Sequence, residues 1–458
     1  MKRTLVLDVV GLTPAMIGTK TPRLQAFANR GALKPLRTIT PAVTCSVQAS
    51  MLTGKLPREH GIVANGWFFR DLAQVWLWRQ SNALVQRDML WDEARKRDDR
   101  FTVAQLFWWY NMYAAVDHAV TPRPIYRADG RKLPDIHTTP GELRDELVGA
   151  LGPFPLFDFW GPRAGIPSSQ WIGRCAAHVW KTKTPTLSLV YLPHLDYDLQ
   201  RFGPDDDRIE LALGEIDEVA GELIDQAERD DARVIVLSEY GITNVTGPIH
   251  VNRALRRAGL IAFREELGEE HLDAGASQAF AVADHQIAHV YVRDAAKLAE
   301  VKALLEREDG IETVLDAEGK RALGLDHERS GELVCIARAD RWFTYYWWLD
   351  DQRAPDYART VDIHSKPGYD PCELFVDPNI PLPKLYLAGR LLRSKVLNLR
   401  TLMDVIPLDA TLVKGSHGRP TDREEDGPVL LTNAPKLAGE AALAATDVRR
   451  LVLDHLFG

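Results

Sequence analysis

Four short apolar runs constrain the fold of this chain more than any other feature. They read TLVLDVV, FTVAQLFWW, LSLVYL and ARVIVLS, at residues 4–10, 101–109, 187–192 and 232–238. Runs of this kind are typical of strands that are buried on both faces of a parallel sheet. Helical patterns lie between them, for example at residues 21–31 and 210–230. Because strands alternate with helices, we expect a doubly wound, mostly parallel α/β sheet.

The length of 458 residues exceeds that of one ordinary domain. A helical pattern, AAKLAEVKALLERE, precedes GELVCIARADRWFTYYWWLDD, which predicts an antiparallel pair of strands. We therefore predict a smaller α+β insertion over residues 294–399, within a core of residues 1–293 and 400–458. Irregular structure, rich in Pro and Gly, is expected to cover the core near residues 110–170.

Charge and cysteine content exclude several classes of protein. The net charge is −8 and the basic residues are scattered, which argues against a nucleic-acid partner. Asp8 interrupts the first apolar run, and no apolar stretch reaches the length of a membrane span. The four cysteines are far apart and form no CxxC pair. We expect a cytoplasmic enzyme or binding protein without a membrane partner, and its oligomeric state stays open.

Carboxylates follow three of the predicted strands. Asp8 lies near the end of the first strand, Asp196 comes four residues after LSLVYL, and Glu239 comes directly after VIVLS. The carboxyl ends of parallel strands converge on one crevice, where ligands bind. Like charges that close repel, so they indicate a bound cation or raised pKa values. Alternatively, each carboxylate caps a helix or closes a turn.

The stretch TPAVTCSVQASMLTGKLPREHGIVANGW, residues 40–67, is too polar for a buried strand and too regular for a loose loop. It predicts a helix that begins near Thr44. In that position Thr44 either caps the helix or presents its hydroxyl to a ligand at the helix N-terminus.

Together, these motifs resemble the alkaline phosphatase superfamily, in particular its type I phosphodiesterase/nucleotide pyrophosphatase branch. They are the Asp of the first strand, a Thr followed by LTG and HGI, an Asp before Gly-Pro, an acid after LS, and a late His-Gly. The resemblance implies that two divalent metal ions, usually zinc, flank a Thr nucleophile that attacks a phosphoryl or related ester.

Carried over residue by residue, the resemblance makes Thr44 the nucleophile and Asn65 a donor to the substrate phosphate. The metal ligands that it implies are Asp8, Thr44, Asp196, Glu239 and His417. A Thr hydroxyl is a poor nucleophile at neutral pH, and metal coordination is one way to activate it.

Two imidazoles of the family pattern are missing, because Gln200 and Tyr240 stand where it has His. Oxygen-rich surroundings favour Mn or Mg over Zn. We expect two divalent ions, Zn or Mn, with Mg as the further alternative. His285, in AVADHQIAHVYV, is the first candidate to replace a lost ligand. His364 and Asp370, in VDIHSKPGYDPCELF, come next.

Aromatic residues of the covering segment accompany Arg123, Arg127 and Lys132. They line a pocket for the organic part of a substrate, or they form the underside of a lid packed on the core.

The leading hypothesis is a metal-dependent hydrolase of small-molecule phosphate esters, most similar to a phosphodiesterase or nucleotide pyrophosphatase. One alternative is a catalytically degenerate member that binds an anionic ligand without turnover. Another keeps catalysis but acts on phosphonate or sulfate esters, or is a phosphomutase.

Overall fold

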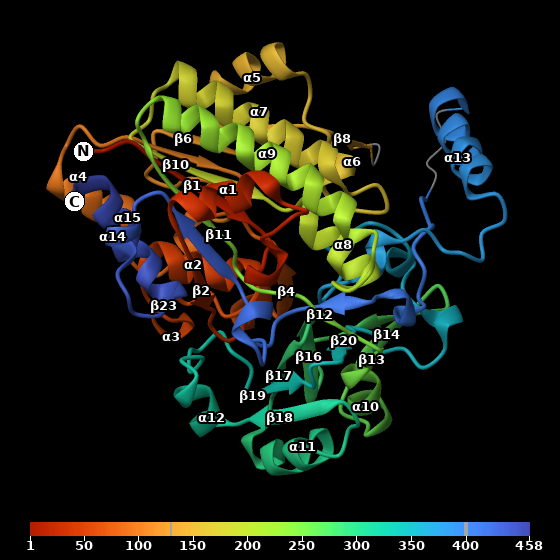
Figure 1. Ribbon diagram of the computed structural model, residues 1–458. Helices are drawn as coiled ribbons and strands as arrows, with labels where there is room; N and C mark the ends of the chain where they lie inside the picture. The colour runs from red at the N-terminus through yellow and green to blue at the C-terminus, as the bar shows by residue number, and fades with distance from the viewer. Residues whose placement is uncertain (129–130, 398–401) are drawn as a thin grey trace.

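The structure is a computed structural model that describes residues 1–128, 131–397 and 402–458. Its largest sheet has nine strands in the order β23-β2-β22-β11-β1-β10-β5-β6-β9 (Figure 1). In that order they are Leu443–Ala444, Ala32–Arg37, Val429–Thr432, Arg233–Leu237, Thr4–Val9, Leu187–Leu192, Val103–Leu106, His118–Pro122 and Ile136–Thr139. The four predicted strands are all present, as the adjacent strands β11, β1, β10 and β5.

The centre of this sheet is parallel. Strands β11, β1, β10, β5 and β6 all run in one direction. Strand β22 pairs antiparallel with β11 and with β2, and β9 pairs antiparallel with β6. The central strands are buried along almost their whole length because helices cover both faces. The predicted α/β fold with a mostly parallel sheet is confirmed.

Two layers of helices enclose the sheet (Figure 1). One contains α1 (Pro22–Arg30), α7 (Ile166–Thr182) and α9 (Ile209–Arg229), and the other contains α2 (Thr44–Thr53), α4 (Leu90–Arg97) and α15 (Val448–Phe457). In α9, buried residues such as Ile209, Ile216 and Leu223 recur at helical spacing and face the sheet. The other helices that accompany the nine-stranded sheet are α3 (Pro57–His60), α5 (Leu143–Leu151), α6 (Leu156–Phe159), α8 (His194–Phe202) and α14 (Pro435–Ala438).

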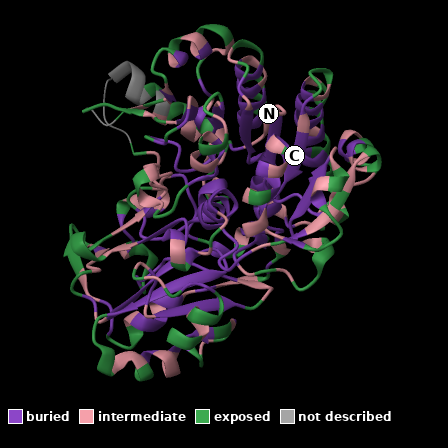
Figure 2. Ribbon diagram, turned by 90° about the vertical axis from the view of Figure 1, so that its left-hand side faces the viewer, coloured by how far each residue is buried: buried purple, intermediate pink, exposed green. Residues whose placement is uncertain are grey.

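A second, antiparallel sheet has the strand order β16-β17-β19-β18. Its strands are Ala279–Asp284, Ile287–Val292, Leu333–Ala337 and Ile311–Leu315, and α10 (Val251–Arg257), α11 (Leu298–Leu305) and α12 (Ala317–Ala322) accompany them. The central strands of both sheets are buried, whereas β2, β18 and the outer helices also have exposed positions (Figure 2). The second sheet already includes β16 and β17, which precede residue 294. The division into core and insertion stays a prediction, and its boundary at 399–400 lies outside the described residues.

The predicted antiparallel pair within residues 331–351 is wrong. Strand β19 pairs with β17 and β18, whereas β20 (Arg341–Phe343) pairs in parallel with β13 (Gly247–Ile249). Apolar alternation identifies strands but not their partners, and the turn after β19 carries β20 away from the second sheet.

Four further strand pairs are short. They are β3 (Gly66–Phe69) with β4 (Gln74–Leu77), β7 (Ile125–Tyr126) with β8 (Lys132–Leu133), β12 (Thr243–Asn244) with β21 (Gly415–Ser416), and β14 (Phe263–Glu266) with β15 (Glu269–Leu272). Residues 129–130, within the predicted covering segment, lie outside the described residues.

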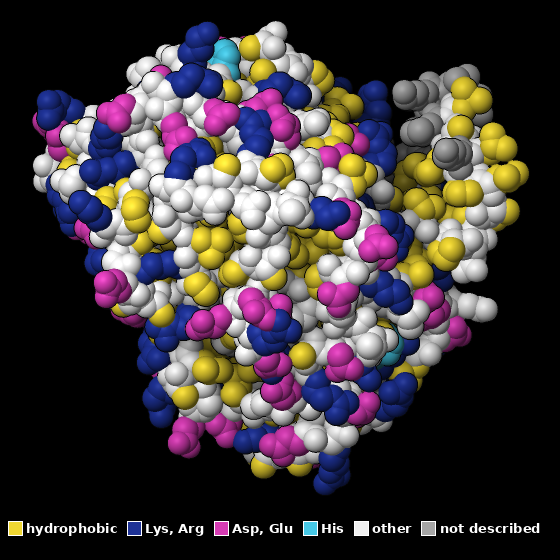
Figure 3. Space-filling view, viewed as in Figure 1, with side chains coloured by type: hydrophobic (Ala, Val, Ile, Leu, Met, Phe, Trp, Pro, Cys, Tyr) yellow, Lys and Arg dark blue, Asp and Glu magenta, His cyan; other side chains and the backbone are white. Residues whose placement is uncertain are grey.

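Charged side chains of both signs are interspersed over the face in Figure 3. Hydrophobic side chains gather near α13 (Pro383–Leu397), where Leu385 and Leu392 are exposed. In the described part of the chain, none of the helices has both the length and the apolar character that crossing a bilayer requires.

Candidate active site

Thr44 is the first residue of α2 and lies at a buried helix N-terminus. The capping position belongs to Val43, whose backbone is extended, so Thr44 is not the helix cap. The Thr44 hydroxyl instead lies 3.1 Å from the hydroxyl of Tyr240. The first turn of a helix presents backbone N–H groups and the positive end of the helix dipole, which suits an anion.

Every residue of α2 is buried, including its polar ones. Ser50 Oγ lies 2.8 Å from His60 Nε2, and His60 Nδ1 accepts a hydrogen bond from the backbone N–H of Ile62. His60 therefore joins α2 to the loop that leads to Asn65. The polar positions that distinguish this stretch hold the site together rather than facing solvent.

Gln48 bridges two carboxylates from the helix side. Its Nε2 donates to Asp8 Oδ2 at 3.1 Å and to Glu239 Oε1 at 2.7 Å. The backbone N–H of Trp109 donates to Gln48 Oε1 at 2.8 Å, which fixes the orientation of the amide. Burial and the charge of Glu239 raise the pKa of Asp8 well above its usual range. Burial raises the pKa of Glu239 to about 7.

Asp196 lies in the first turn of α8 and receives a donor on each carboxyl oxygen. Gln200 Nε2 donates to Oδ2 at 2.6 Å, and the Tyr240 hydroxyl donates to Oδ1 at 3.3 Å. His417 Nε2 lies 3.8 Å from Oδ1. Burial raises the pKa of Asp196 to about 7, although the donors from Gln200 and Tyr240 lower it. Gln200 and Tyr240, which stand where the family has histidines, thus both donate hydrogen bonds to the Asp196 carboxylate.

Asn65 connects the helix start to the second sheet. Its Oδ1 accepts from the backbone N–H of Cys45 at 3.0 Å, and its Nδ2 donates to Asp284 Oδ1 at 3.0 Å. Asp284 thus accepts from both the side-chain amide and the backbone N–H of Asn65. The role of Asn65 as a phosphate donor stays a prediction.

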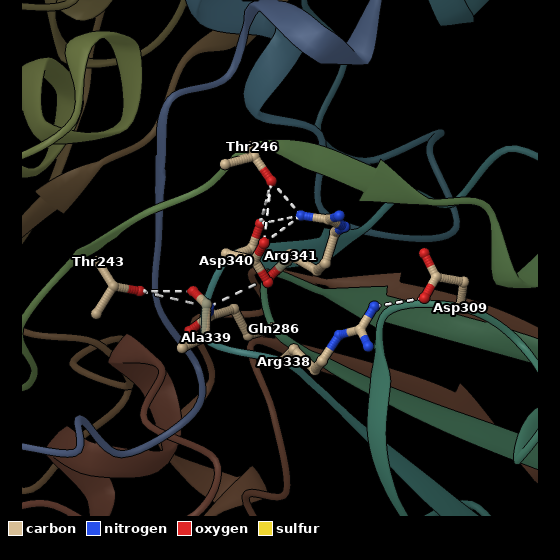
Figure 4. A network of polar contacts seen from close by, with 8 residues as sticks. All are labelled: Thr243, Thr246, Gln286, Asp309, Arg338, Ala339, Asp340 and Arg341. Carbon is tan, nitrogen blue, oxygen red and sulfur yellow. Dashed lines mark hydrogen bonds and ion pairs between the residues drawn. The ribbon is translucent and has the colours of Figure 1, made fainter.

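His285 reaches the site from the tight turn between β16 and β17. Its φ of 60° lies in the left-handed region, which a non-glycine residue rarely adopts and which costs free energy. The turn is held by neighbouring backbone, because Phe343 N–H donates to His285 O and Gln286 N–H donates to His417 O. Gln286 Nε2 also donates to the carbonyl of Ala339, in the network that Figure 4 shows.

Four rings form a continuous stack beside Thr44. Tyr240 lies 3.6 Å from His417, His417 lies 3.7 Å from His285, and His285 lies 3.7 Å from Tyr369, all between ring centroids. Burial lowers the pKa of His285 and of His417 well below the usual value, so both imidazoles are neutral. Nε2 of His285 is buried and has no partner among the described residues.

The five core site residues predicted from the sequence, Asp8, Thr44, Asp196, Glu239 and His417, are linked by these contacts, and His285 joins them. His364 and Asp370 are not brought to them. His364 is exposed, and Asp370 pairs with Lys366 at 2.7 Å.

Sequence reasoning missed Tyr369, whose hydroxyl donates to Gln200 Oε1 at 2.9 Å. No motif marks this tyrosine. The sequence signal for Tyr369 was its position next to Asp370, in the loop that was predicted to supply metal ligands.

Comparison with known proteins identifies the family of this chain. The chain matches the type I phosphodiesterase/nucleotide pyrophosphatase family over residues 4–370. It belongs to that family. The resemblance inferred from the motifs is therefore confirmed, and this is a family of phosphoric ester hydrolases.

One relative with a similar sequence is itself uncharacterized. An uncharacterized pyrophosphatase/phosphodiesterase of Schizosaccharomyces pombe is 25% identical over 231 residues, which are 48% of this chain and 41% of that protein. The chain thus matches about two-fifths of the length of this relative.

Two solved structures share the fold over nearly the whole chain. Murine ectonucleotide pyrophosphatase/phosphodiesterase 5, an inactive Thr-to-Ala form in complex with AMP, has a TM-score of 0.59 at 15% identity and covers 100% of this chain and 95% of its own. Phosphonoacetate hydrolase from Sinorhizobium meliloti, with phosphonoformate, has a TM-score of 0.63 at 14% identity and covers 99% and 96%. At such identities the likeness concerns the fold.

Members of the type I phosphodiesterase family generally depend on divalent metals. Asp8 Oδ1 and Glu239 Oε2 are buried and have no partner among the described residues. With the hydroxyl of Thr44 they would make an oxygen-only set, which suits Mg or Mn better than Zn. A set of this kind would fit one hard cation.

A second cation at Asp196 would have to displace the hydrogen bonds from Gln200 and Tyr240. Within the described ranges, no three side chains of His, Cys, Asp or Glu gather as a metal-binding group.

Proposed function

We propose that this protein hydrolyses small-molecule phosphoric esters, with a phosphodiester or a pyrophosphate as the substrate class, and that Thr44 is the nucleophile. One observation carries the proposal: the Thr44 hydroxyl, at a buried helix N-terminus, is hydrogen-bonded to Tyr240 beside Asp196. An anionic ester would lie at the positive end of the α2 dipole, where Asn65 already accepts from the N–H of Cys45, and the Thr44 hydroxyl would face its phosphorus.

In the proposed reaction Thr44 Oγ forms a bond to phosphorus while the bond to the leaving oxygen breaks. The Thr44 proton passes to the Tyr240 oxygen as the Tyr240 proton passes to Asp196 Oδ1. The departing oxygen takes a proton from solvent, and Asp196 releases the proton that it received. Water then attacks phosphorus and breaks its bond to Thr44 Oγ, and one proton of that water re-forms the Thr44 hydroxyl. Activation of a hydroxyl by an adjacent acceptor is an established way to make a weak nucleophile react.

A divalent cation held by Asp8, Glu239 and Thr44 would supply Lewis-acid stabilisation of charge on the phosphoryl oxygens. Asp196, His285 and His417 remain predicted ligands of a second ion. His417 is held by its Nδ1, 2.8 Å from the carbonyl oxygen of Ala42, so that Nε2 faces Asp196. The murine relative whose Thr-to-Ala form is described as inactive and binds AMP supports a Thr-dependent reaction on phosphate esters.

The test is hydrolysis of a chromogenic phosphodiester by purified protein, as isolated and after addition of Mg, Mn or Zn, beside a phosphonate and a sulfate ester. Metal content of the same samples is measured by mass spectrometry. Metal-stimulated turnover of the phosphodiester, lost in Thr44→Ala, is expected. Faster turnover of the phosphonate or of the sulfate ester would mean that this ester, and not a phosphodiester, is the substrate class.

A second candidate, a non-catalytic anion binder, is favoured by one observation. The amide N–H₂ of Gln48 donates to both Asp8 and Glu239, where a cation would otherwise compensate their charges. Protein that contains no metal, binds inorganic phosphate and hydrolyses none of the esters would establish this candidate instead.

A further inference from the structure

A group of basic side chains lies on the segments that flank the Thr44 site. Arg79 comes two residues after β4, Arg123 follows β6, and Lys132 begins β8. Their contacts are unusual for cations. The Arg79 guanidinium stacks 4.3 Å from the centroid of Trp76, Arg123 Nη1 donates to the sulfur of Met112 at 3.6 Å, and Lys132 Nζ lies 5.9 Å from an aromatic centroid. In the described chain, these three make no salt bridge, and Arg79 Nε is buried without a partner.

The charges lie within reach of one another. The side chain of His364 keeps exposed surface, but its ring is partly desolvated, and this desolvation together with the positive charges of Arg79, Lys132 and Arg123 lowers its pKa. Met112, which contacts Arg123, forms a bridge with Ser81, two residues beyond Arg79. Burial also lowers the pKa of Lys132 and of Arg79, while the charges of Glu373 and Asp362 raise that of Lys132. Partly buried cations without a carboxylate partner carry a desolvation cost that a bound anion would offset.

Carboxylates near this group are already engaged. The Asp362 carboxylate accepts hydrogen bonds from Ser365 Oγ at 2.7 Å and from the backbone N–H of His364. Glu373 pairs with the buried amine of Lys366 at 2.7 Å. Neither carboxylate forms a salt bridge with Arg79, Arg123 or Lys132 in the described structure.

Trp78 connects the basic group to the Thr44 site. It precedes Arg79 and has a φ of 60°, a strained backbone that points to a functional constraint. Its ring lies 4.8 Å from Trp109 and 6.0 Å from Tyr369, between ring centroids. Trp109 donates to Gln48, and Tyr369 donates to Gln200. The rings of Trp78, Trp109 and Tyr369 therefore connect the residues around Thr44 with Arg79, which follows Trp78 in the chain.

We propose that Arg79, Arg123 and Lys132 form a second anion-binding site, which takes an anionic group in the organic part of the substrate. The substrate class is then a phosphoric ester that also carries a phosphate or a carboxylate. Multiple guanidinium and ammonium donors bind such groups through charge-assisted hydrogen bonds. The assignment of the first anion to the helix N-terminus rests on the proposed function. The second site stands on its own contacts.

The test compares the binding of alkane bisphosphonates with that of alkylphosphonates of matched length, by calorimetry on the full chain. The variants are Arg79→Gln, Lys132→Gln and their combination, with Lys181→Gln, on the exposed part of α7, as a control for lost charge. Arg79→Lys keeps the charge if Arg79→Gln does not fold. We expect each loss of charge to weaken bisphosphonate binding about tenfold and to leave alkylphosphonate binding unchanged. Added salt shortens the Debye length, so it should reduce the difference in affinity between the bisphosphonate and the alkylphosphonate.

Two results separate this inference from the proposed function. Selective loss of bisphosphonate affinity in the variants, together with no turnover of any ester, supports the second site and refutes the hydrolase. Equal affinity of wild-type protein for both probes, together with normal turnover of a simple diester, refutes the second site and leaves the hydrolase. Carboxyalkyl phosphonates, run in parallel, identify which second anion is preferred.

Discussion

The hydroxyl of Tyr240 lies 3.1 Å from that of Thr44, and it donates to Asp196 on its other side. Tyr240→Phe removes this oxygen and keeps the ring that stacks on His417. We expect turnover to fall by about 100-fold, the usual scale for losing a proton-transfer partner, with little change in KM.

Tyr291→Phe is the matched control, because it also removes a buried hydroxyl with a hydrogen bond, 2.8 Å long, to the carbonyl of Arg329. It should lower stability without lowering turnover. Unchanged turnover in Tyr240→Phe would show that Thr44 reacts without this partner.

Thr44 variants distinguish a nucleophile from a structural residue. Thr44→Ala should abolish turnover, whereas Thr44→Ser should keep a measurable part of it because the hydroxyl remains. Since Val43 occupies the capping position, Thr44→Ala should not carry the loss of about 1 kcal/mol expected for a cap. Thermal denaturation and steady-state kinetics on the same preparations provide both readouts. A stable Thr44→Ala protein with full activity would exclude Thr44 from the chemistry.

His285 offers a pair of variants that differ mainly in backbone strain. Both His285→Ala and His285→Gly remove the imidazole, so we expect both to lower activity and bound metal. Because the φ of His285 is 60°, glycine should be more stable than alanine here by about 1 kcal/mol. Urea denaturation of the two variants measures the difference. Equal stability would mean that the turn relaxes when the imidazole is removed, and unchanged metal content would make His285 structural.

His60 should make stability depend on pH. Burial lowers its pKa to about 3, from an ordinary value of 6.5 that the unfolded chain regains. Below that ordinary value the unfolded state binds a proton that the folded state does not, so stability falls as pH falls. From about pH 7 to about pH 5 the contribution of His60 amounts to about 2 kcal/mol. His60→Gln cannot titrate, and its urea midpoint should fall less over this range than that of the wild type. Parallel pH profiles would contradict a buried, neutral His60.

The sequence predicted the elements of the core better than it predicted their contacts. The apolar runs that became β11, β1, β10 and β5 are recognisable because buried parallel strands leave little freedom in side-chain type. The partner of β20 was not predictable, because pairing depends on contacts far along the chain. For the site, Asp8, Thr44, Asp196 and Glu239 stood out because strand ends and helix starts have simple signatures. Tyr369 did not, since only the folded loop brings it to His285.

Lys366 should be essential for that loop. Its amine is buried and lies 2.7 Å from both Asp370 Oδ2 and Glu373 Oε1, with Thr360 O at 2.9 Å. Burial alone would lower the pKa of Lys366, but the two carboxylates raise it, so the amine is charged. Lys366→Met leaves two carboxylates buried without a cation, which costs about 3–5 kcal/mol.

The matched control is Lys55→Met, which breaks the exposed pair with Glu59, 3.3 Å apart, and should cost less than about 1 kcal/mol. Denaturation midpoints of the two variants give the comparison. Tyr369 lies between Lys366 and Asp370, so turnover of Lys366→Met should also fall at temperatures where the protein remains folded. If Lys366→Met were as stable and active as Lys55→Met, the carboxylates would have to be protonated or hydrated, and the loop would not depend on this ion cluster to place Tyr369 against His285.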